Sequence, residues 1–190
     1  MKVLGINGSA RLNGNTAIML QVALAEMEAE DIDTELVQLG PKALQGCIAC
    51  YKCFENKDGR CAVDDAMNGY IEKMRQADGI LLGSPTYFAD VTTNIKSLMD
   101  RAGMVARAND DMFSRKVGAA VVTARRGGAI HTFDTLNHFF FISQMIVPGS
   151  SYWNMGYGRE PGQVNSDDEG LRTMHVLGKN MAWLLKKLAD

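Results

Sequence analysis

Short apolar runs alternate five times with longer segments of helical spacing along this chain, and no other feature of the sequence limits its fold as strongly. The predicted strands cover residues 2–7, 34–39, 80–83, 117–123 and 145–147. A segment in which apolar residues recur every three or four positions, as on one face of a helix, lies between each strand and the next and after the last strand. After the second strand it begins only at residue 64, beyond a connection with little periodicity. Strands that alternate with helices form parallel sheets covered on both faces, so we expect an α/β fold.

Right-handed crossover connections leave few arrangements for five such strands. A doubly wound sheet with the strand order 2-1-3-4-5 fits their number, and its ligand site lies at the carboxyl ends of the strands. The last helix is predicted to begin at a capping box, in which Ser166 and Glu169 would each bond the other's backbone N–H group.

The composition is that of an ordinary folded protein with one domain. Of the 190 residues, 46% are hydrophobic and 22% are charged, which excludes disorder over most of the chain. A net charge of -2 provides no basic surface for nucleic acid or anionic membranes. The N-terminal apolar run is too short for a signal peptide and no run is long enough to span a bilayer, so we expect a cytoplasmic protein.

A polar loop, Gly-Ser-Ala-Arg-Leu-Asn-Gly-Asn-Thr at residues 8–16, joins the first predicted strand to the first helix. Backbone N–H groups and the helix dipole make such a loop an anion site. Ser9, Asn13, Asn15 and Thr16 add hydrogen-bond donors, and Arg11 adds a full charge. The loop lacks the spacing of a Walker loop or a dinucleotide fingerprint, so a monophosphate suits it best. A capped helix start without any ligand is the alternative.

This loop resembles the phosphate loop of the NAD(P)H-dependent FMN reductase superfamily, whose members have the flavodoxin-like fold. The resemblance implies that the loop holds the phosphate of FMN. The residues it assigns to this role are Ser9, Arg11, Asn13, Asn15 and Thr16.

Two further segments resemble loops that this family places at the carboxyl ends of strands. One consists of Ser84, Pro85, Thr86, Tyr87 and Phe88, and the other includes Thr123, Arg125, Gly127 and Gly128. The resemblance implies that they border the two edges of the flavin ring. A flavin needs an apolar wall and close backbone approach, which aromatic residues and paired glycines provide. Taken alone, Pro85 and Phe88 would equally well shape and pack a loop.

All four cysteines of the chain lie in one connection: Cys47, Cys50, Cys53 and Cys61. Two successive two-residue gaps are the spacing of ferredoxin ligands to a [4Fe-4S] cluster, although the last gap here is longer. Zinc, and thiols or disulfides without metal, are the alternatives. The combination resembles the iron–sulfur flavoproteins, a branch of the same superfamily. It implies a cysteine-rich insertion at about 42–63 within one FMN-binding domain of residues 1–190.

The sequence therefore predicts an FMN-dependent oxidoreductase that relays electrons between an iron–sulfur cluster and flavin. No side chain is expected to be catalytic, because the flavin itself carries the redox chemistry. A cluster-free NAD(P)H-dependent FMN or quinone reductase and a flavodoxin-like electron carrier are the alternatives. NAD(P)H or ferredoxin is the expected redox partner. The resemblance and the Phe-rich segment 132–142 favour a homodimer or homotetramer.

Overall fold

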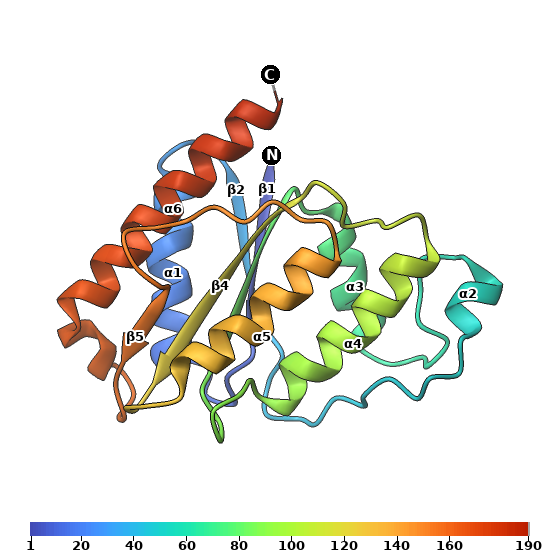
Figure 1. Cartoon of the computed structure of the whole chain (residues 1–190), viewed down its shortest axis with the longest axis horizontal. Coiled ribbons are helices and arrows are strands. Elements are labelled where there is room, and N and C mark those ends of the chain that lie inside the picture. Colours follow the sequence, from blue (N-terminus) through green and yellow to red (C-terminus); the bar gives the residue numbers. More distant parts are fainter. Residues whose placement is uncertain (190) are drawn as a thin grey trace.

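The structure, a computed structural model that describes residues 1–189, contains a five-stranded sheet flanked by helices (Figure 1). The strands are β1 (Lys2–Asn7), β2 (Asp33–Gln38), β3 (Gly79–Pro85), β4 (Val117–Ala124) and β5 (Met155–Tyr157). The helices are α1 (Asn15–Glu28), α2 (Lys52–Asn56), α3 (Met67–Gln76), α4 (Thr93–Ala108), α5 (Ala129–Ile142) and α6 (Asp168–Ala189), with a 3₁₀ helix, η1, at Gln163–Ser166. Neighbouring strands are parallel in the order β2-β1-β3-β4-β5, so the predicted fold class is confirmed.

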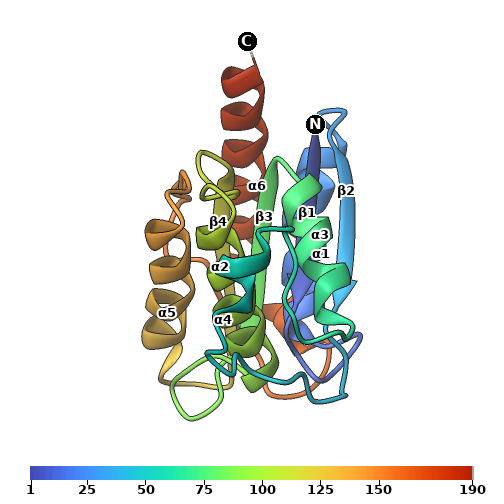
Figure 2. The ribbon, with the colours of Figure 1, turned by 90° about the vertical axis from the view of Figure 1, so that its right-hand side faces the viewer.

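Helices cover both faces of the sheet, as Figures 1 and 2 show. Helices α1 and α6 pack against one face, and α3, α4 and α5 pack against the other. Every residue of β4 is buried, as expected for a strand covered on both sides. The two layers of helices explain why this strand lacks the polar alternation of a strand with one wet face.

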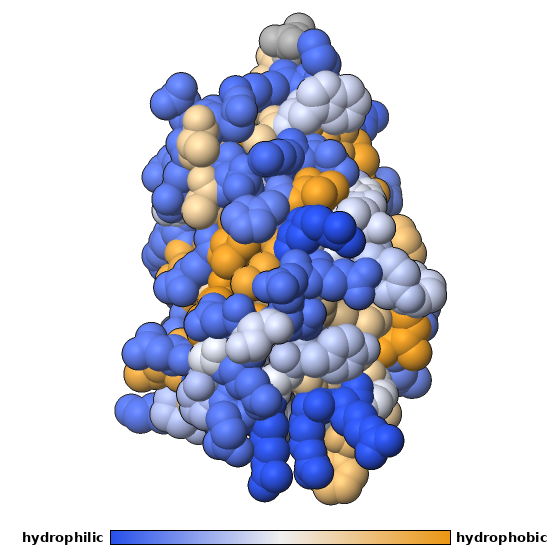
Figure 3. All heavy atoms as spheres, turned by 90° about the vertical axis from the view of Figure 1, so that its left-hand side faces the viewer, coloured by the Kyte–Doolittle hydropathy of each residue, from blue (hydrophilic) through white to orange (hydrophobic). Residues whose placement is uncertain are grey.

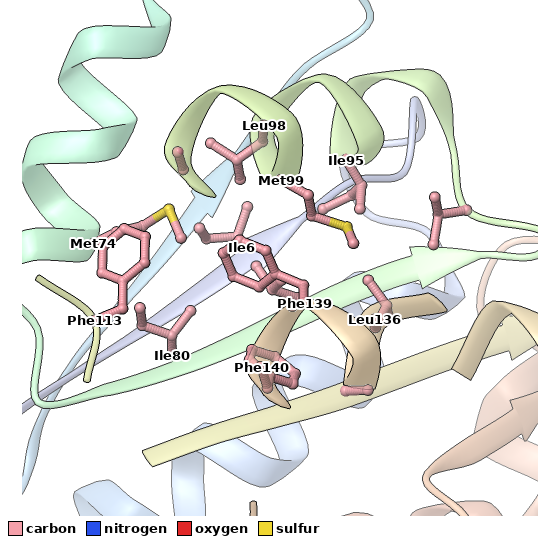
Figure 4. Close-up of a cluster of buried hydrophobic side chains, with 14 of the residues drawn as sticks. Ile6, Met74, Ile80, Ile95, Leu98, Met99, Phe113, Leu136, Phe139 and Phe140 are labelled. Atoms are coloured by element: carbon pink, nitrogen blue, oxygen red, sulfur yellow. The ribbon is translucent and has the colours of Figure 1, made fainter. Parts of the chain in front are cut away.

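The larger hydrophobic core lies between the sheet and the helices α3, α4 and α5 (Figure 4). Ile6 of β1 and Ile80 of β3 lie opposite Leu98 of α4, and Phe139 of α5 packs beside them, all within this buried cluster. Complete burial of a side chain of this size contributes about 1.5–3 kcal/mol. This packing holds the strands firmly, with their carboxyl ends at one edge of the sheet.

The fifth strand is not at residues 145–147, where the sequence analysis placed it. That segment passes the start of β4, where Ile146 forms an isolated bridge with Val117, and it then leaves the sheet at Pro148. Proline has no N–H group with which to continue a ladder, which is the physical reason for the departure. The chain returns as β5 and pairs with residues 122–124 at the end of β4. The residues after β5 therefore lie at the carboxyl edge of the sheet.

The predicted capping box of the last helix is also wrong. Ser166 belongs to η1, and Asp167 caps α6 instead, because its Oδ1 accepts the Gly170 N–H group at 3.0 Å. Oδ2 of Asp167 accepts the Tyr157 N–H group at 2.7 Å, which ties the helix to β5. This contact between distant residues is not visible in a local Ser-x-x-Glu pattern. Across residues 1–189, no helix combines the length and the apolar character that crossing a membrane requires.

Candidate functional site

A cavity of about 180 Å³ lies at the carboxyl ends of β1, β3 and β4, where this fold places its ligands. It is lined by Ser9, Arg11, Asn15, Thr16, Pro85, Thr86, Tyr87, Thr123, Ala124, Arg125, Gly158 and Arg159. All of these except Ala124, Gly158 and Arg159 were predicted as site residues, so the fold brings the three loops together. The predicted cofactor-binding residues outside this lining are Asn13, Ser84, Phe88, Gly127 and Gly128.

The loop between β1 and α1 has the geometry of an anion site. Ser9 stabilises it, because its N–H group donates to Asn7 Oδ1 at 3.0 Å and its Oγ accepts the Arg11 N–H group at 3.1 Å. Gly14 precedes α1 and offers no side-chain oxygen to the first turn of the helix. Helix N-termini leave backbone N–H groups without partners inside the helix, and these groups and the dipole favour an anion.

The side chain of Asn15 holds protein rather than facing the cavity as a free donor. Its Nδ2 donates to the carbonyl oxygens of Gly158 and Glu160 at 2.9 Å and 3.1 Å, and its Oδ1 accepts the Val164 N–H group at 3.4 Å. A side-chain amide has two N–H bonds, so both are used. Asn15 therefore fastens the loop after β5 beside the cavity and leaves only its backbone N–H group for a ligand.

Positive charge gathers at this edge of the sheet. Arg11, Arg125 and Arg159 line the cavity, and Arg126 lines a neighbouring one. Arg11 Nη1 also donates to the Arg159 carbonyl oxygen at 3.1 Å, which joins the loops after β1 and β5. Figure 3 shows strongly hydrophilic side chains at the lower end of one face, the end at which β3 and β4 finish in Figure 1. Guanidinium groups can bind phosphate through two parallel hydrogen bonds, so this edge suits a phosphate ester.

Pro85, the last residue of β3, and Tyr87, in the loop that follows, supply the apolar wall of the cavity. Ser84 is fully buried and orients this loop: its Oγ donates to the Pro85 carbonyl oxygen at 2.8 Å and accepts the Thr92 N–H group at 3.1 Å. Phe88 is completely exposed at the loop tip, with a left-handed φ of 50°. An aromatic ring left in water beside a cavity gains free energy when it covers a flat ligand.

The loop after β4 borders a second cavity, of about 410 Å³, through Gly127 and Gly128. Three half-exposed aromatic residues also line it: Tyr152, Trp153 and Tyr157. Gly128 has a φ of 89°, and a Cβ atom there would lie 3.1 Å from Ala89 Cα. The loops after β3 and β4 therefore meet at a position that only glycine fills without strain.

Sequence reasoning missed Gly158 and Arg159. The Gly158 N–H group donates to the Ala124 carbonyl oxygen at 2.9 Å, which continues the pairing of β4 and β5 to the edge of the cavity. A Cβ atom at Gly158 would lie 2.8 Å from Asn15 Nδ2. The available signal was the glycine between Tyr157 and Arg159, which could be interpreted only once β5 was placed directly before it.

The cysteine segment runs from the carboxyl edge of the sheet out past α2 and back to α3 (Figures 1 and 2). Ala49 and Tyr51 have left-handed φ values of 51° and 56°, so the chain turns sharply between the first three cysteines. Such conformations are costly for residues other than glycine and cluster at functional sites.

All four cysteines are free thiols in the structure: Cys47 and Cys50 are exposed, Cys61 is partly exposed and Cys53 is buried. Burial raises the pKa of the Cys53 thiol. Within residues 1–189, no three Cys, His, Asp or Glu side chains lie close enough together to hold a metal ion. The donor chemistry of the segment fits an iron–sulfur cluster, whereas the four sulfurs do not converge in this conformation.

The sequence model of a protein family described as NADPH-dependent FMN reductase matches residues 1–160. The chain belongs to this family. An iron-sulfur flavoprotein of Methanocaldococcus jannaschii is 40% identical to it over 192 residues, with 98% of each chain covered. An iron-sulfur flavoprotein of Methanosarcina thermophila is 30% identical over 188 residues, with 98% of this chain and 96% of that one covered. This member of the NADPH-dependent FMN reductase family is an FMN-containing oxidoreductase, as the sequence predicted.

Solved structures agree on the fold of this FMN reductase family member. A flavodoxin from the domain Archaea has a TM-score of 0.64 at 16% identity, with 98% of this chain and 99% of that one covered. A flavone reductase has a TM-score of 0.72 at 19% identity, with 100% of this chain and 65% of that one covered. At these identities the likeness concerns the flavodoxin-like fold alone.

The residues present at the cavity fit the cofactor of the FMN reductase family. FMN combines one phosphate with a flat, largely apolar ring, so its site needs concentrated anion-binding groups beside an apolar wall. The start of α1 and the nearby arginines provide the first, and Pro85 and Tyr87 provide the second.

Proposed function

We propose that the cavity at the ends of β1, β3 and β4 binds FMN, with its phosphate in the loop from Ser9 to Thr16. The observation that carries this proposal is the start of α1, which has no side-chain cap and lies beside three arginines that line the same cavity. The flavin ring would lie against Pro85 and Tyr87. The glycine-containing loop after β4 would form its opposite border.

FMN supplies the redox chemistry when it is bound, because its ring accepts and releases electrons. The side chains of the cavity bind and orient it. Arg11 and Arg125 neutralise the phosphate, and the Thr16 and Thr123 hydroxyl groups hold the start of α1 against the end of β4. Phe88 and the aromatic residues of the second cavity exclude water from the ring. We assign no catalytic role to a side chain.

We further propose that Cys47, Cys50, Cys53 and Cys61 hold a [4Fe-4S] cluster that exchanges electrons with the flavin. Four thiol sulfurs on one segment are the ligand type that such a cluster requires, and the similarity to iron-sulfur flavoproteins supports the assignment. Binding requires the exposed part of the segment to move toward Cys53, which packs in the core beside α4. The segment at about 42–63 is then an insertion in one FMN-binding domain.

We also propose an electron donor, a compartment and an oligomeric state for this protein. NAD(P)H or ferredoxin would reduce the protein. The proposed compartment is the cytoplasm, where clustered cysteines are kept reduced and hold metal or carry out redox chemistry. Phe141 and Ile142 leave an exposed apolar surface on α5, which favours burial in a homodimer or homotetramer.

Fluorescence titration of the apoprotein with FMN tests the cofactor site. Arg11→Gln is expected to raise the Kd about 10- to 150-fold, because a hydrogen bond to a charged group contributes about 1.5–3 kcal/mol. Arg107→Gln removes a half-exposed arginine of α4, away from the cavity, and should leave the affinity unchanged. Equal FMN affinities of Arg11→Gln and the wild type would contradict the assignment.

Anaerobic reconstitution followed by iron and acid-labile sulfide analysis tests the cluster. The wild type is expected to bind roughly four of each per chain. Cys53→Ser should lose both while it retains FMN, because the cysteine segment is separate from the flavin cavity. A wild-type protein that takes up neither iron nor sulfide would contradict the cluster.

A cluster-free NAD(P)H-dependent FMN or quinone reductase is the second candidate. The exposure of Cys47 and Cys50 away from the buried Cys53 favours it. Steady-state NAD(P)H oxidation with a quinone acceptor distinguishes the two candidates. Wild-type rates in Cys53→Ser would support the cluster-free reductase, whereas a loss of turnover with FMN retained would support the electron relay.

A further inference from the structure

A completely buried arginine on α4 holds the end of the cysteine segment. The Arg101 side chain has no exposed surface, and its guanidinium makes a two-pronged pair with Asp65, at 2.7 Å from Nη1 and 2.8 Å from Nη2. Nη2 also donates to the Val63 carbonyl oxygen at 2.9 Å, and Nη1 to the Gln45 carbonyl oxygen at 3.2 Å. These contacts lie on both sides of the four cysteines in the sequence, so Arg101 closes the segment into a loop.

The remaining N–H group of this guanidinium points at a cysteine. Arg101 Nε donates to Cys61 Sγ at 3.3 Å. Burying a guanidinium is costly unless all its donors are satisfied, and here one of them is satisfied by sulfur. The guanidinium is planar, and Asp65 holds both of its terminal nitrogens, Nη1 and Nη2. The direction of the Nε–H bond toward Cys61 is therefore fixed.

A second buried side chain holds the backbone of the same cysteine. The Cys61 N–H group donates to Asn68 Oδ1 at 2.8 Å, and Asn68 Nδ2 donates to the Cys61 carbonyl oxygen at 3.0 Å. Asn68 lies on α3 and Arg101 on α4, so two helices that pack on the same face of the sheet fix Cys61. Cys47 and Cys50, by comparison, are exposed. The cysteine segment is therefore held in place at its Cys61 end and exposed to solvent at its Cys47 end.

We propose that Arg101 is the positioning residue of the cysteine site, and that its Nε–H group sets the reduction potential of a cluster held there through a hydrogen bond to the Cys61 sulfur. This inference rests on the proposed cluster. A hydrogen bond to a ligating sulfur favours the reduced cluster, which carries one more negative charge, and therefore raises the potential. Cys61, like the buried Cys53, is then a fixed ligand toward which the exposed Cys47 and Cys50 move.

Arg101→Lys tests the proposal, because lysine keeps a positive charge near Asp65 but has neither Nε–H nor the planar fork. Arg107→Lys, on the exposed face of the same helix, is the matched control. Anaerobic redox titration of the reconstituted proteins, followed by EPR, measures the cluster potential. It should be more negative in Arg101→Lys than in the wild type and unchanged in Arg107→Lys. If the cluster in reconstituted Arg101→Lys has the same reduction potential as the cluster in the wild type, the proposal is overturned.

Hydrogen exchange in the metal-free protein separates this inference from the proposed cluster. Amides of residues 59–65 should exchange faster in Arg101→Lys than in the wild type, while amides of β1 keep their rates. If the wild type takes up no iron or sulfide, the cluster proposal fails, and equal exchange of residues 59–65 in both proteins then overturns the positioning role as well. FMN content and circular dichroism report folding. Should the lysine variant not fold, Asp65→Asn is expected to show the same faster exchange of residues 59–65, because it removes the carboxylate that holds the guanidinium, and wild-type exchange in that variant would overturn the positioning role.

Discussion

The Oγ1 atoms of Thr16 and Thr123 lie 2.7 Å apart, and both side chains are almost completely buried. This hydrogen bond joins the first turn of α1 to the carboxyl end of β4, across 107 positions of sequence. Both residues line the cavity that we assign to FMN. The pair therefore connects two of the three loops on which the site depends.

Thr16→Val should lower the free energy of unfolding by about 1–3 kcal/mol, because it leaves the buried Thr123 hydroxyl without this partner. Thr16→Ser keeps the hydroxyl and should cost less. The double variant Thr16→Val, Thr123→Val removes both polar groups and should recover much of the loss. Urea denaturation measures these three variants and the single variant Thr123→Val, which completes the cycle. A double variant that loses the sum of the single losses would argue against the pairing.

The two glycines after β4 should respond differently to the same substitution. Gly128→Ala places a Cβ 3.1 Å from Ala89 Cα at a φ of 89°, whereas a Cβ at Gly127 meets nothing within 4 Å. We expect Gly128→Ala to destabilise the protein by about 1 kcal/mol or more and to weaken FMN binding, and Gly127→Ala to leave the stability unchanged. Thermal unfolding and FMN titration test this pair. Equal effects of both substitutions would show that the loops after β3 and β4 do not meet there.

The ion pair between Asp65 and Arg101 should make stability depend on acid pH. Hydrogen bonds from Arg101 hold the pKa of the Asp65 carboxyl below its ordinary value. Since the folded-state pKa is the lower one, the stabilisation is fully present above the unfolded-state pKa of about 4 and is lost as the pH falls through the folded-state value. Asp65→Asn should therefore cost about 1–3 kcal/mol at pH 7, and its difference from the wild type should shrink in acid.

Urea denaturation at a series of pH values measures this dependence. Asp64→Asn is the matched control, because the Asp64 side chain is 94% exposed and its ion pair with Arg60 spans 3.7 Å. It should change stability by less than about 0.5 kcal/mol at any pH. An Asp65→Asn difference that is constant from neutral to acid pH would contradict the assignment.

The packing of α1 against α6 depends on a helical glycine. A Cβ at Gly178 would collide with the Ala23 carbonyl oxygen of α1 and lie 2.7 Å from Glu26 Cβ. Gly178→Ala should destabilise the protein by about 1–3 kcal/mol, as overpacking does. Gly69→Ala, on an open face of α3, should instead be neutral or stabilise by up to about 1 kcal/mol. Thermal unfolding distinguishes them, and a tolerated Gly178→Ala would contradict the close approach of the two helices.

Much of the fold could be predicted from local patterns. Residues 2–7 and 117–123 are apolar runs of strand length, and the order of strands followed from their alternation with helices and from the handedness of crossovers. The strand-end loops could be predicted as a site for the same reason, because parallel strands bring their carboxyl ends to one edge. The resemblance of three loops to one family then indicated FMN.

The position of β5 could not be predicted from such patterns. Residues 145–147 and 155–157 are both short and apolar, and only pairing with β4 selects the second. The side chain of Asn15 has a donor that any sequence analysis would offer to a phosphate, yet its partners are carbonyl oxygens more than 140 positions away. Arg101 appears in the sequence as one more charged residue of an amphipathic helix.

By itself, the sequence determined the alternation of strands and helices, the three polar or glycine-containing loops and the grouping of four thiols. Hydrophobic period and turn chemistry act over a few residues, so they can be recognised in a linear chain. Only the tertiary structure decided which strand completes the sheet, which donors remain free for a ligand and which buried cation holds Cys61. Those outcomes depend on hydrogen bonds and desolvation between residues far apart in sequence, and these exist only once the chain has folded.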